Sequence, residues 1–141
     1  MSSERIQYKD TRDITLDSIL ALYTANGWSA AQKPQQLYNA LMASHFLLSA
    51  WDEAKLVGLG NAITDGYLVV YYPHLLVLPQ YQKQGIGSKL MKTLVSRYLG
   101  FHQQALIADR QAVEFYHKCG FERAKMTQSM WIYQGSDRYN L

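Results

Sequence analysis

Residues 75–91 read LLVLPQYQKQGIGSKLM, and this stretch decides how the rest of the chain is organised. An apolar run ends at Pro79, a polar loop with Gly85 and Gly87 follows, and apolar residues then recur at helical spacing from Ile86 onward. The pattern predicts a strand, a tight loop and a helix. The first N–H groups of a helix lack intrahelical partners and lie at the positive end of its dipole, so this turn favours an anion. The glycines let the backbone come close to that anion.

Two well-known phosphate-binding patterns do not fit this loop. A nucleotide P-loop needs Gly-Lys-Ser/Thr, whereas here Ser88 precedes Lys89, and a dinucleotide fingerprint needs a third glycine where Leu90 stands. The pattern Gln82-x-x-Gly85-x-Gly87 after a strand resembles the acyl-CoA pyrophosphate loop of the GNAT superfamily of N-acetyltransferases. The alternative is a plain strand-to-helix turn in which the glycines serve the backbone geometry alone.

Composition favours one folded domain over residues 1–141. The chain is 48% hydrophobic and 18% charged, which is typical of globular proteins and not of disordered ones. The net charge is +3 with scattered basic residues, so nucleic-acid binding has little support, while an anionic ligand would be attracted.

Cys119 is the only cysteine, which excludes an internal disulfide. No apolar run follows Met1 and none approaches the roughly 20 residues of a membrane span, so we expect a cytoplasmic protein without membrane contact.

Apolar periodicity and turn residues predict ten elements in the order β-α-α-β-β-β-α-β-α-β. Helices are expected from Thr15 to Gly27, from Pro34, from Ile86 to Gly100 and from Asp109 to Gly120. Strands are expected at 6–8, 46–51, 56–64, 67–78, 105–108 and 126–133, with a polar tail at 135–141. Pro73 should cause a bulge or an unpaired edge in the fourth strand. The order predicts an α+β fold in which a mixed central sheet is flanked by about four helices, and it is also the order of the GNAT fold.

Residues 109–121, DRQAVEFYHKCGF, form the second motif. They are similar to Asn-x-x-Ala-x-x-Phe-Tyr-x-x-x-Gly-Phe, which many GNAT enzymes carry. The resemblance implies that Tyr116 is the general acid that protonates the departing CoA thiolate; the alternative is a core aromatic on a helix face. The sequence departs from the pattern at Asp109, where asparagine is usual. An ionised aspartate can only accept hydrogen bonds, so we expect a helix cap there, and a side-chain contact with the cofactor stays open.

The resemblance implies acetyl-CoA as co-substrate and no metal. The strand before the loop should splay at its bulge and pair its free backbone groups with the pantetheine arm, as an added strand would. The same opening would let backbone N–H groups polarise the thioester carbonyl. The residues expected to bind the cofactor are Leu76, Val77 and Leu78 on the strand, Gln82, Lys83, Gln84, Gly85, Ile86, Gly87 and Ser88 in the loop, and Asp109 and Tyr116.

The acceptor amine must lose a proton, and His74 is the only group in residues 67–78 that titrates near neutral pH. It is expected to act as base or to hold a water molecule; the alternative is a purely structural histidine.

Trp28 follows the first helix, in a loop that edges the acceptor pocket of GNAT folds, and Tyr23, Tyr71 and Tyr72 could join it. Residues 22–28, LYTANGW, are similar to small bacterial and plastid GNAT enzymes, including plant-type arylalkylamine acetyltransferases. That similarity favours a small aromatic amine, whereas the alternative is that Trp28 packs against the sheet.

We therefore expect an N-acetyltransferase that transfers acetyl to a primary amine of a small molecule by direct attack in a ternary complex. Cys119 reads as a small buried residue and not as an acetylated intermediate. Two alternatives stay open: an enzyme that acetylates proteins or peptides, and a non-catalytic acyl-CoA-binding regulatory module. Dimers are common in the family, so a homodimer is also considered.

Overall fold

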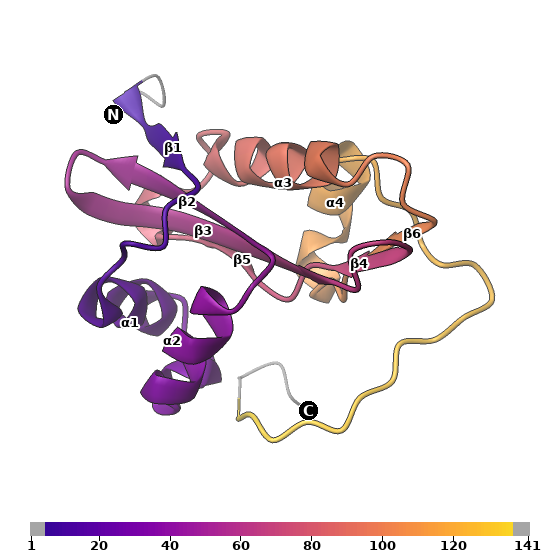
Figure 1. The fold of residues 1–141 in the computed structure, drawn as a ribbon, viewed down its shortest axis with the longest axis horizontal. Helices are drawn as coiled ribbons and strands as arrows, with labels where there is room; N and C mark the ends of the chain where they lie inside the picture. The colour runs from indigo at the N-terminus through magenta and orange to yellow at the C-terminus, as the bar shows by residue number, and fades with distance from the viewer. Residues whose placement is uncertain (1–4, 137–141) are drawn as a thin grey trace.

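The computed structural model describes residues 5–136 and has a mixed six-stranded sheet with helices on both faces (Figure 1). The strands are β1 (Gln7–Lys9), β2 (Phe46–Asp52), β3 (Lys55–Thr64), β4 (Val69–Tyr71), β5 (Leu75–Val77) and β6 (Gln103–Ala105). The helices are α1 (Leu16–Ala25), α2 (Pro34–Met42), α3 (Ile86–Arg97) and α4 (Val113–Lys118). Short 3₁₀ turns are η2 (Ser29–Gln32), η3 (Pro79–Tyr81) and η4 (Arg110–Ala112). The predicted α+β class is confirmed.

The strands follow the order β1-β2-β3-β4-β6, and β5 pairs with β3 outside this path. Neighbouring strands are antiparallel except for β4 and β6, which are parallel. Helices α1 and α2 lie on one side of the sheet and α3 on the other (Figure 1). No helix within residues 5–136 combines the length and the apolar character that a membrane crossing requires.

The predicted helix starts are confirmed by their local contacts. The Thr15 side chain accepts a hydrogen bond from the Ser18 N–H at 3.2 Å, which caps α1. Pro34 occupies the first turn of α2, where its missing N–H costs nothing. Gly85 precedes α3 with φ 89°, a left-handed conformation that favours glycine.

Two glycines of β3 let α3 pack closely on the middle of the sheet. A Cβ atom on Gly58 would lie 3.2 Å from Leu90 Cδ1, and one on Gly60 would lie 2.9 Å from Leu94 Cδ1. Leu90 and Leu94 are fully buried against these positions. The close contact fixes the start of α3 next to β5, which is where the candidate site is built.

The strand expected over 67–78 is divided into β4 and β5, so the predicted interruption at Pro73 is confirmed and a single long strand is wrong. β4 pairs in parallel with β6 as far as Tyr71, which lies opposite Ala105. Past Pro73 the chain turns away from β6, and β5 pairs with β3, with Val77 opposite Gly58. Within the described residues no strand pairs with the other edge of β5. Proline has no N–H to continue the ladder, which explains the break.

The strand expected over residues 105–108 lies at Gln103–Ala105 and is half-exposed, because β6 is the last strand of the sheet within the described residues. The fourth helix begins as the 3₁₀ turn η4 and continues as the six-residue α4. Both elements therefore exist where the sequence predicts them, although their limits differ.

The strand predicted over residues 126–133 is wrong. After α4 the chain runs away from the sheet and returns on the side of α2 without regular structure up to residue 136 (Figure 1). Met126 is 100% exposed and Ile132 is 95% exposed. Alternating apolar residues show which side chains could face a core, but a strand also needs a paired edge, and this segment does not reach β6. Residues 137–141 of the predicted polar tail lie outside the described residues.

Candidate functional site

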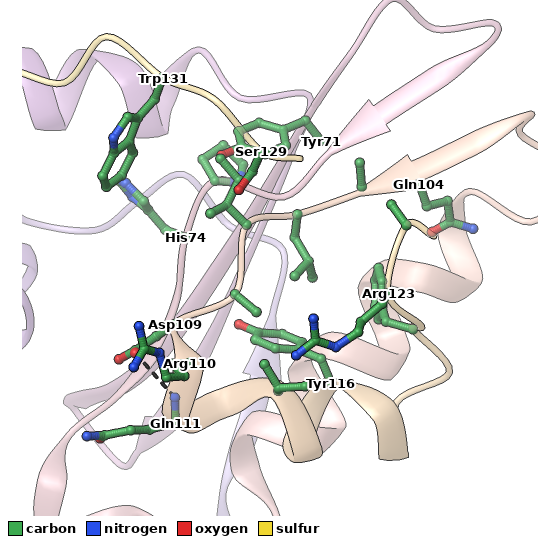
Figure 2. Close-up of a pocket in the computed structure, with 18 of the residues that line it drawn as sticks. Tyr71, His74, Gln104, Asp109, Arg110, Gln111, Tyr116, Arg123, Ser129 and Trp131 are labelled. Atoms are coloured by element: carbon green, nitrogen blue, oxygen red, sulfur yellow. Dashed lines mark hydrogen bonds between the residues drawn. The ribbon is translucent and has the colours of Figure 1, made fainter. Parts of the chain in front are cut away.

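A cavity of about 1640 Å³ opens where the chain leaves β4 and diverges from β6. One wall comes from the loop after α1 and from Tyr71, Pro73 and His74, and another from the region of residues 103–113 and from α4. The third wall comes from the segment after α4, and Figure 2 shows Ser129 and Trp131 across from Tyr116. Three parts of the chain that lie far apart in sequence therefore meet around this cavity, and His74, the residue before β5, is part of its wall.

The loop before α3 has the properties of an anion site, although it is not part of the cavity wall. The would-be Cβ of Gly85 has nothing within 4 Å, so the backbone there is open to a ligand. No side chain caps the N–H groups at the start of α3, and residues 79–91 contain two lysines and no acidic residue. The predicted diphosphate cradle fits these groups, since they offer N–H donors and positive potential without a competing carboxylate.

Gly87 also has a packing role. A Cβ atom there would lie 3.4 Å from Cζ of Phe115, so the glycine allows α4 to lie close to α3. The Phe115 and Tyr116 rings are 5.0 Å apart. Helix α4 therefore contacts the loop through Phe115 and lines the cavity with Tyr116. The alternative, in which the glycines serve the geometry of the turn and not a ligand, therefore explains part of the role of Gly87.

The backbone contacts expected from residues 76–78 need correction. The Leu78 N–H donates to the Val57 carbonyl at 2.8 Å, so it is turned toward β3. Leu76 lies opposite Leu59 in the same ladder. Successive residues of a strand direct their backbone groups to opposite edges, so only Val77 among the three faces the open edge. Its carbonyl accepts from the Gln82 side chain at 3.0 Å, which ties the loop to β5.

Tyr116 extends from α4 toward the middle of the cavity (Figure 2). Its hydroxyl makes no hydrogen bond with another residue in the part of the chain that the structure describes, 5–136, so no neighbour there competes for its proton. Burial, with smaller contributions from Cys119 and Asp109, raises the pKa of Tyr116 to about 12. The hydroxyl therefore stays protonated near neutral pH and can donate a hydrogen bond into the cavity.

Two neighbours of Tyr116 behave as the sequence predicts. Cys119 is buried, and burial raises the pKa of its thiol, so the reactive thiolate is disfavoured. The Asp109 carboxylate accepts from the Gln111 N–H at 3.3 Å and caps η4. A further contact between Asp109 and the cofactor stays a prediction.

His74, Trp28 and Tyr23 form an aromatic cluster beside the cavity. The Trp28 ring lies 5.2 Å from the His74 ring and 5.6 Å from the Tyr23 ring, with both pairs edge to face. The Tyr23 hydroxyl lies 2.7 Å from His74 Nδ1. Trp28 and His74 both line the cavity. The two readings of Trp28 are thus compatible, since it packs against neighbours and also presents a face to the cavity.

The placement of the tyrosines corrects the predicted acceptor pocket. Tyr23 is fully buried behind Trp28 and His74, and Tyr72 is buried with its hydroxyl donating to Gln104 Oε1 at 2.6 Å. Neither lines the cavity, so neither is placed to touch an acceptor. Tyr71, one residue away in sequence, does line it. A side chain on a strand reverses its direction with each residue, which explains why neighbours differ.

The sequence analysis missed the contribution of the segment after α4. Trp131 and Tyr133 line the cavity and stack on each other with their ring centres 4.3 Å apart. The Ser29 and Tyr133 hydroxyl oxygens lie 3.4 Å apart, which links this segment to η2. The alternation that places residues 131 and 133 on one side is visible in the sequence, but it predicts a last strand over residues 126–133 and not a cavity wall.

Comparison with known proteins gives matches along most of the chain. Residues 11–131 match the family profile described as an acetyltransferase (GNAT) domain. A solved GNAT family acetyltransferase from Streptococcus pneumoniae TIGR4 is 34% identical, with a TM-score of 0.76 over 92% of this chain and 98% of that one. A probable acetyltransferase from meticillin-resistant Staphylococcus aureus is 25% identical, with a TM-score of 0.80 over 92% of this chain and 99% of that one.

Curated relatives match over part of their own length. Histone acetyltransferase TAP1 of Glycine max is 28% identical in an alignment of 135 positions that covers 84% of this chain and 57% of that protein. The chloroplastic GCN5-related N-acetyltransferase 2 of Arabidopsis thaliana is 39% identical in an alignment of 74 positions that covers 50% of this chain and 28% of that protein. The chain thus spans from about a quarter to just over half of the length of these relatives.

Proposed function

The chain belongs to the GNAT family of acetyltransferases, and we propose that it transfers acetyl from acetyl-CoA to the primary amine of a small molecule. The proposal treats residues 1–141 as a single N-acetyltransferase domain. The observation that carries it is the unpaired edge of β5, which lies between the start of α3 and a cavity that Tyr116 and His74 both face. The anion site at the start of α3, the unpaired edge of β5 and the proton donor Tyr116 are therefore adjacent.

Each group has one role in the proposed direct transfer. The N–H groups of residues 83–88 would hold the diphosphate of acetyl-CoA, and the outward groups of Val77 would pair with its pantetheine arm. Tyr116 would donate its hydroxyl proton toward the sulfur as the thiolate departs. His74 would assist the loss of the amine proton. Because Cys119 is buried with a raised thiol pKa, the proposal has no acyl-cysteine step.

The aromatic lining favours a small amine with a flat apolar group as the acceptor. Trp28, Tyr71 and Trp131 contribute rings to the cavity, and such rings bind flat groups by stacking and cations by their faces. The second candidate is a protein or peptide, which the name of the Glycine max relative suggests. A histone tail is basic and binds best to an acidic surface. The cavity lining instead has more basic than acidic side chains, namely Arg110, Arg123 and Lys125 compared with Asp109 and Glu122.

Release of free CoA thiol from acetyl-CoA, measured with and without amines, tests the proposed function. Tryptamine-like amines, polyamines, amino sugars and histone-like peptides form the acceptor panel. The proposal expects release that depends on the amine and is fastest with an aromatic monoamine. Release that occurs only with peptides supports the second candidate, and binding of acetyl-CoA without release with any acceptor supports a regulatory module.

Trp28→Ala is expected to raise the KM for the amine by about tenfold, because a ring of this size contributes roughly 1–3 kcal/mol of apolar contact. The Kd for acetyl-CoA should stay within about twofold, since the proposed diphosphate contacts come from the N–H groups of residues 83–88 and do not include Trp28. Trp28→Phe is the matched control, because it retains an aromatic ring beside His74. A lower melting temperature with an unchanged KM would show that Trp28 only packs.

We further propose that the chain forms a homodimer in the cytoplasm. Met126, Met130 and Ile132 alternate along the segment after α4 and are all strongly exposed, and exposed apolar surface of this kind favours association with a second copy. Met130→Ser combined with Ile132→Ser is expected to lower the mass measured by light scattering from that of two chains to that of one. Leu99→Ser, which changes an exposed residue outside this segment, should leave the mass unchanged. A parent protein that already has the mass of one chain would refute the homodimer.

A further inference from the structure

Tyr81, the last residue of η3, joins the start of the loop before α3 to the end of β2. Its hydroxyl donates to Asp52 Oδ2 at 2.6 Å, and both residues are buried. Arg5 Nη2 donates to the same carboxylate oxygen at 3.0 Å. The contact between Tyr81 and Asp52 connects residues 29 positions apart, and no step of the proposed transfer uses it.

The hydrogen bond between Tyr81 and Asp52 is charge-assisted. It is the main cause that lowers the pKa of Asp52, and desolvation, which opposes it, is smaller. The same hydrogen bond is the main cause that raises the pKa of Tyr81. Asp52 is therefore ionised and Tyr81 protonated near neutral pH. A phenol that donates to a carboxylate forms a shorter and stronger hydrogen bond than a neutral pair does.

The loop that follows Tyr81 has a backbone conformation that needs support. Lys83 has φ 63° and Gly85 has φ 89°, so both residues are left-handed. Glycine adopts this conformation readily, whereas a residue with a side chain is disfavoured in it by about fivefold or more. Such a conformation at Lys83 persists only where the surrounding contacts hold the chain in place.

Residues 82–85 are held from both ends. At the far end Ile86 is buried, and a Cβ atom on Gly58 of β3 would lie 3.3 Å from its Cγ2. At the near end are the Tyr81 hydroxyl and the Gln82 side chain, which donates to a carbonyl of β5. Gln82 is itself among the residues expected to bind the cofactor. The Tyr81 hydroxyl is therefore a polar anchor of the loop that can be removed without removing a proposed ligand contact.

We propose that Tyr81 and Asp52 are positioning residues, which hold the loop before α3 in its diphosphate-binding conformation before acetyl-CoA arrives. This inference rests on the proposed function, because the N–H groups of residues 83–88 are the proposed donors to the diphosphate. Without the Tyr81 hydroxyl, Lys83 would leave its left-handed conformation in a large share of the molecules. Acetyl-CoA would then have to order the loop as it binds, and its affinity would fall in proportion to the share of molecules that are ready to bind.

Titration calorimetry with acetyl-CoA tests the proposal on Tyr81→Phe, which keeps the ring beside Lys55 Nζ and removes only the hydroxyl. The Kd is expected to rise about three- to tenfold, since the loop loses its support. Asp52→Asn retains an acceptor oxygen without the charge, so its Kd should rise less, by about two- to threefold. Tyr98→Phe is the matched control, because it removes a buried hydroxyl that lies 2.8 Å from His45 Nδ1, and it should leave the Kd unchanged.

Lys83→Gly separates positioning of the loop from general stability. Glycine adopts the left-handed conformation without a penalty, so Tyr81→Phe should raise the Kd by less than about twofold in the Lys83→Gly background. The charge of Lys83 is missing from both proteins of that pair, so its own effect on binding cancels. An equal effect of Tyr81→Phe in both backgrounds would overturn the proposal. So would a folded Tyr81→Phe protein that has a lower melting temperature and the Kd of the parent.

Failure of the proposed function gives a different result. A parent protein that binds acetyl-CoA but releases no CoA with any amine would refute the transfer, while the Kd values still decide the role of Tyr81. A parent that does not bind acetyl-CoA would refute both. If Tyr81→Phe does not fold, the same comparison is made with Asp52→Asn, whose Kd should exceed that of its background only where Lys83 is present.

Discussion

Tyr116→Phe is expected to lower kcat by about 10²–10⁴-fold, the usual contribution of a positioned proton donor. The substitution removes one hydroxyl and retains the ring, which packs edge to face on Phe115 and Phe121 at 5.0 and 6.0 Å. The fold should therefore survive. The KM for acetyl-CoA should change little, because the hydrogen bond to sulfur strengthens only as the thiolate departs.

The raised pKa of Tyr116 keeps this group from limiting the rate near neutral pH. A donor acts while it is protonated, so its contribution is present below its pKa and is lost as pH rises through that value. With a pKa raised to about 12, the parent should show no decline of kcat from this group up to roughly pH 10. The rate should instead rise with pH as the acceptor amine becomes neutral. Burial also makes Tyr116 a weaker acid than an ordinary tyrosine, so it would act on the departing sulfur by donating a hydrogen bond more than by complete proton loss.

Tyr98→Phe is the matched control for Tyr116→Phe, because it removes a hydroxyl that lies 2.8 Å from His45 Nδ1 and not in the cavity. It should change thermal stability and leave kcat within about twofold. An acyl donor with a more acidic thiol should recover part of the activity lost in Tyr116→Phe, since that thiolate departs without help. A folded Tyr116→Phe protein with nearly full kcat would identify Tyr116 as a packing residue and leave protonation of sulfur to water.

Local patterns predicted the helices, most of the strands and the break at Pro73, because each depends on residues close in sequence. Thr15, Pro34 and Gly85 act within one helical turn of their own position, so their effects can be read from the chain itself. The loop and the Tyr116 helix were also predictable, since each motif occupies one continuous segment. The resemblance to a family then placed the two segments beside each other, which no local pattern could do.

Contacts between distant segments explain what the sequence could not predict. Tyr23 and Tyr72 carry aromatic rings near the right elements, but which face each ring takes depends on the packing of α1 and β3. The partnership between Tyr23 and His74 joins residues 51 positions apart. The segment after α4 has the alternation of a strand, yet strand formation depends on whether the edge of β6 is within reach. In each case the missing information is a long-range pairing and not a local preference.

Gly87→Glu is expected to weaken acetyl-CoA binding by about 10- to 100-fold relative to Gly87→Gln. The glycine lies in the first turn of α3, after Gly85 at φ 89°, where the N–H groups have no side-chain cap. A carboxylate placed there would satisfy the positive end of the helix and repel the diphosphate, and like charges near a protein surface interact by a few kcal/mol at about 4 Å. Glutamine has nearly the same volume without the charge, so the difference between the two variants isolates the electrostatic effect.

Gly87→Ala separates this charge effect from the packing role of the glycine. The added methyl group would lie 3.4 Å from the Phe115 ring, a close contact that a small movement of α4 can relieve. Alanine also favours the helix by about 0.5–1 kcal/mol over glycine, so the variant should fold. We therefore expect a Kd for acetyl-CoA within about threefold of the parent by titration calorimetry, with the loss appearing in Gly87→Glu and growing weaker as salt is added. A folded Gly87→Glu protein that binds acetyl-CoA as tightly as Gly87→Gln would show that the diphosphate does not bind at the start of α3.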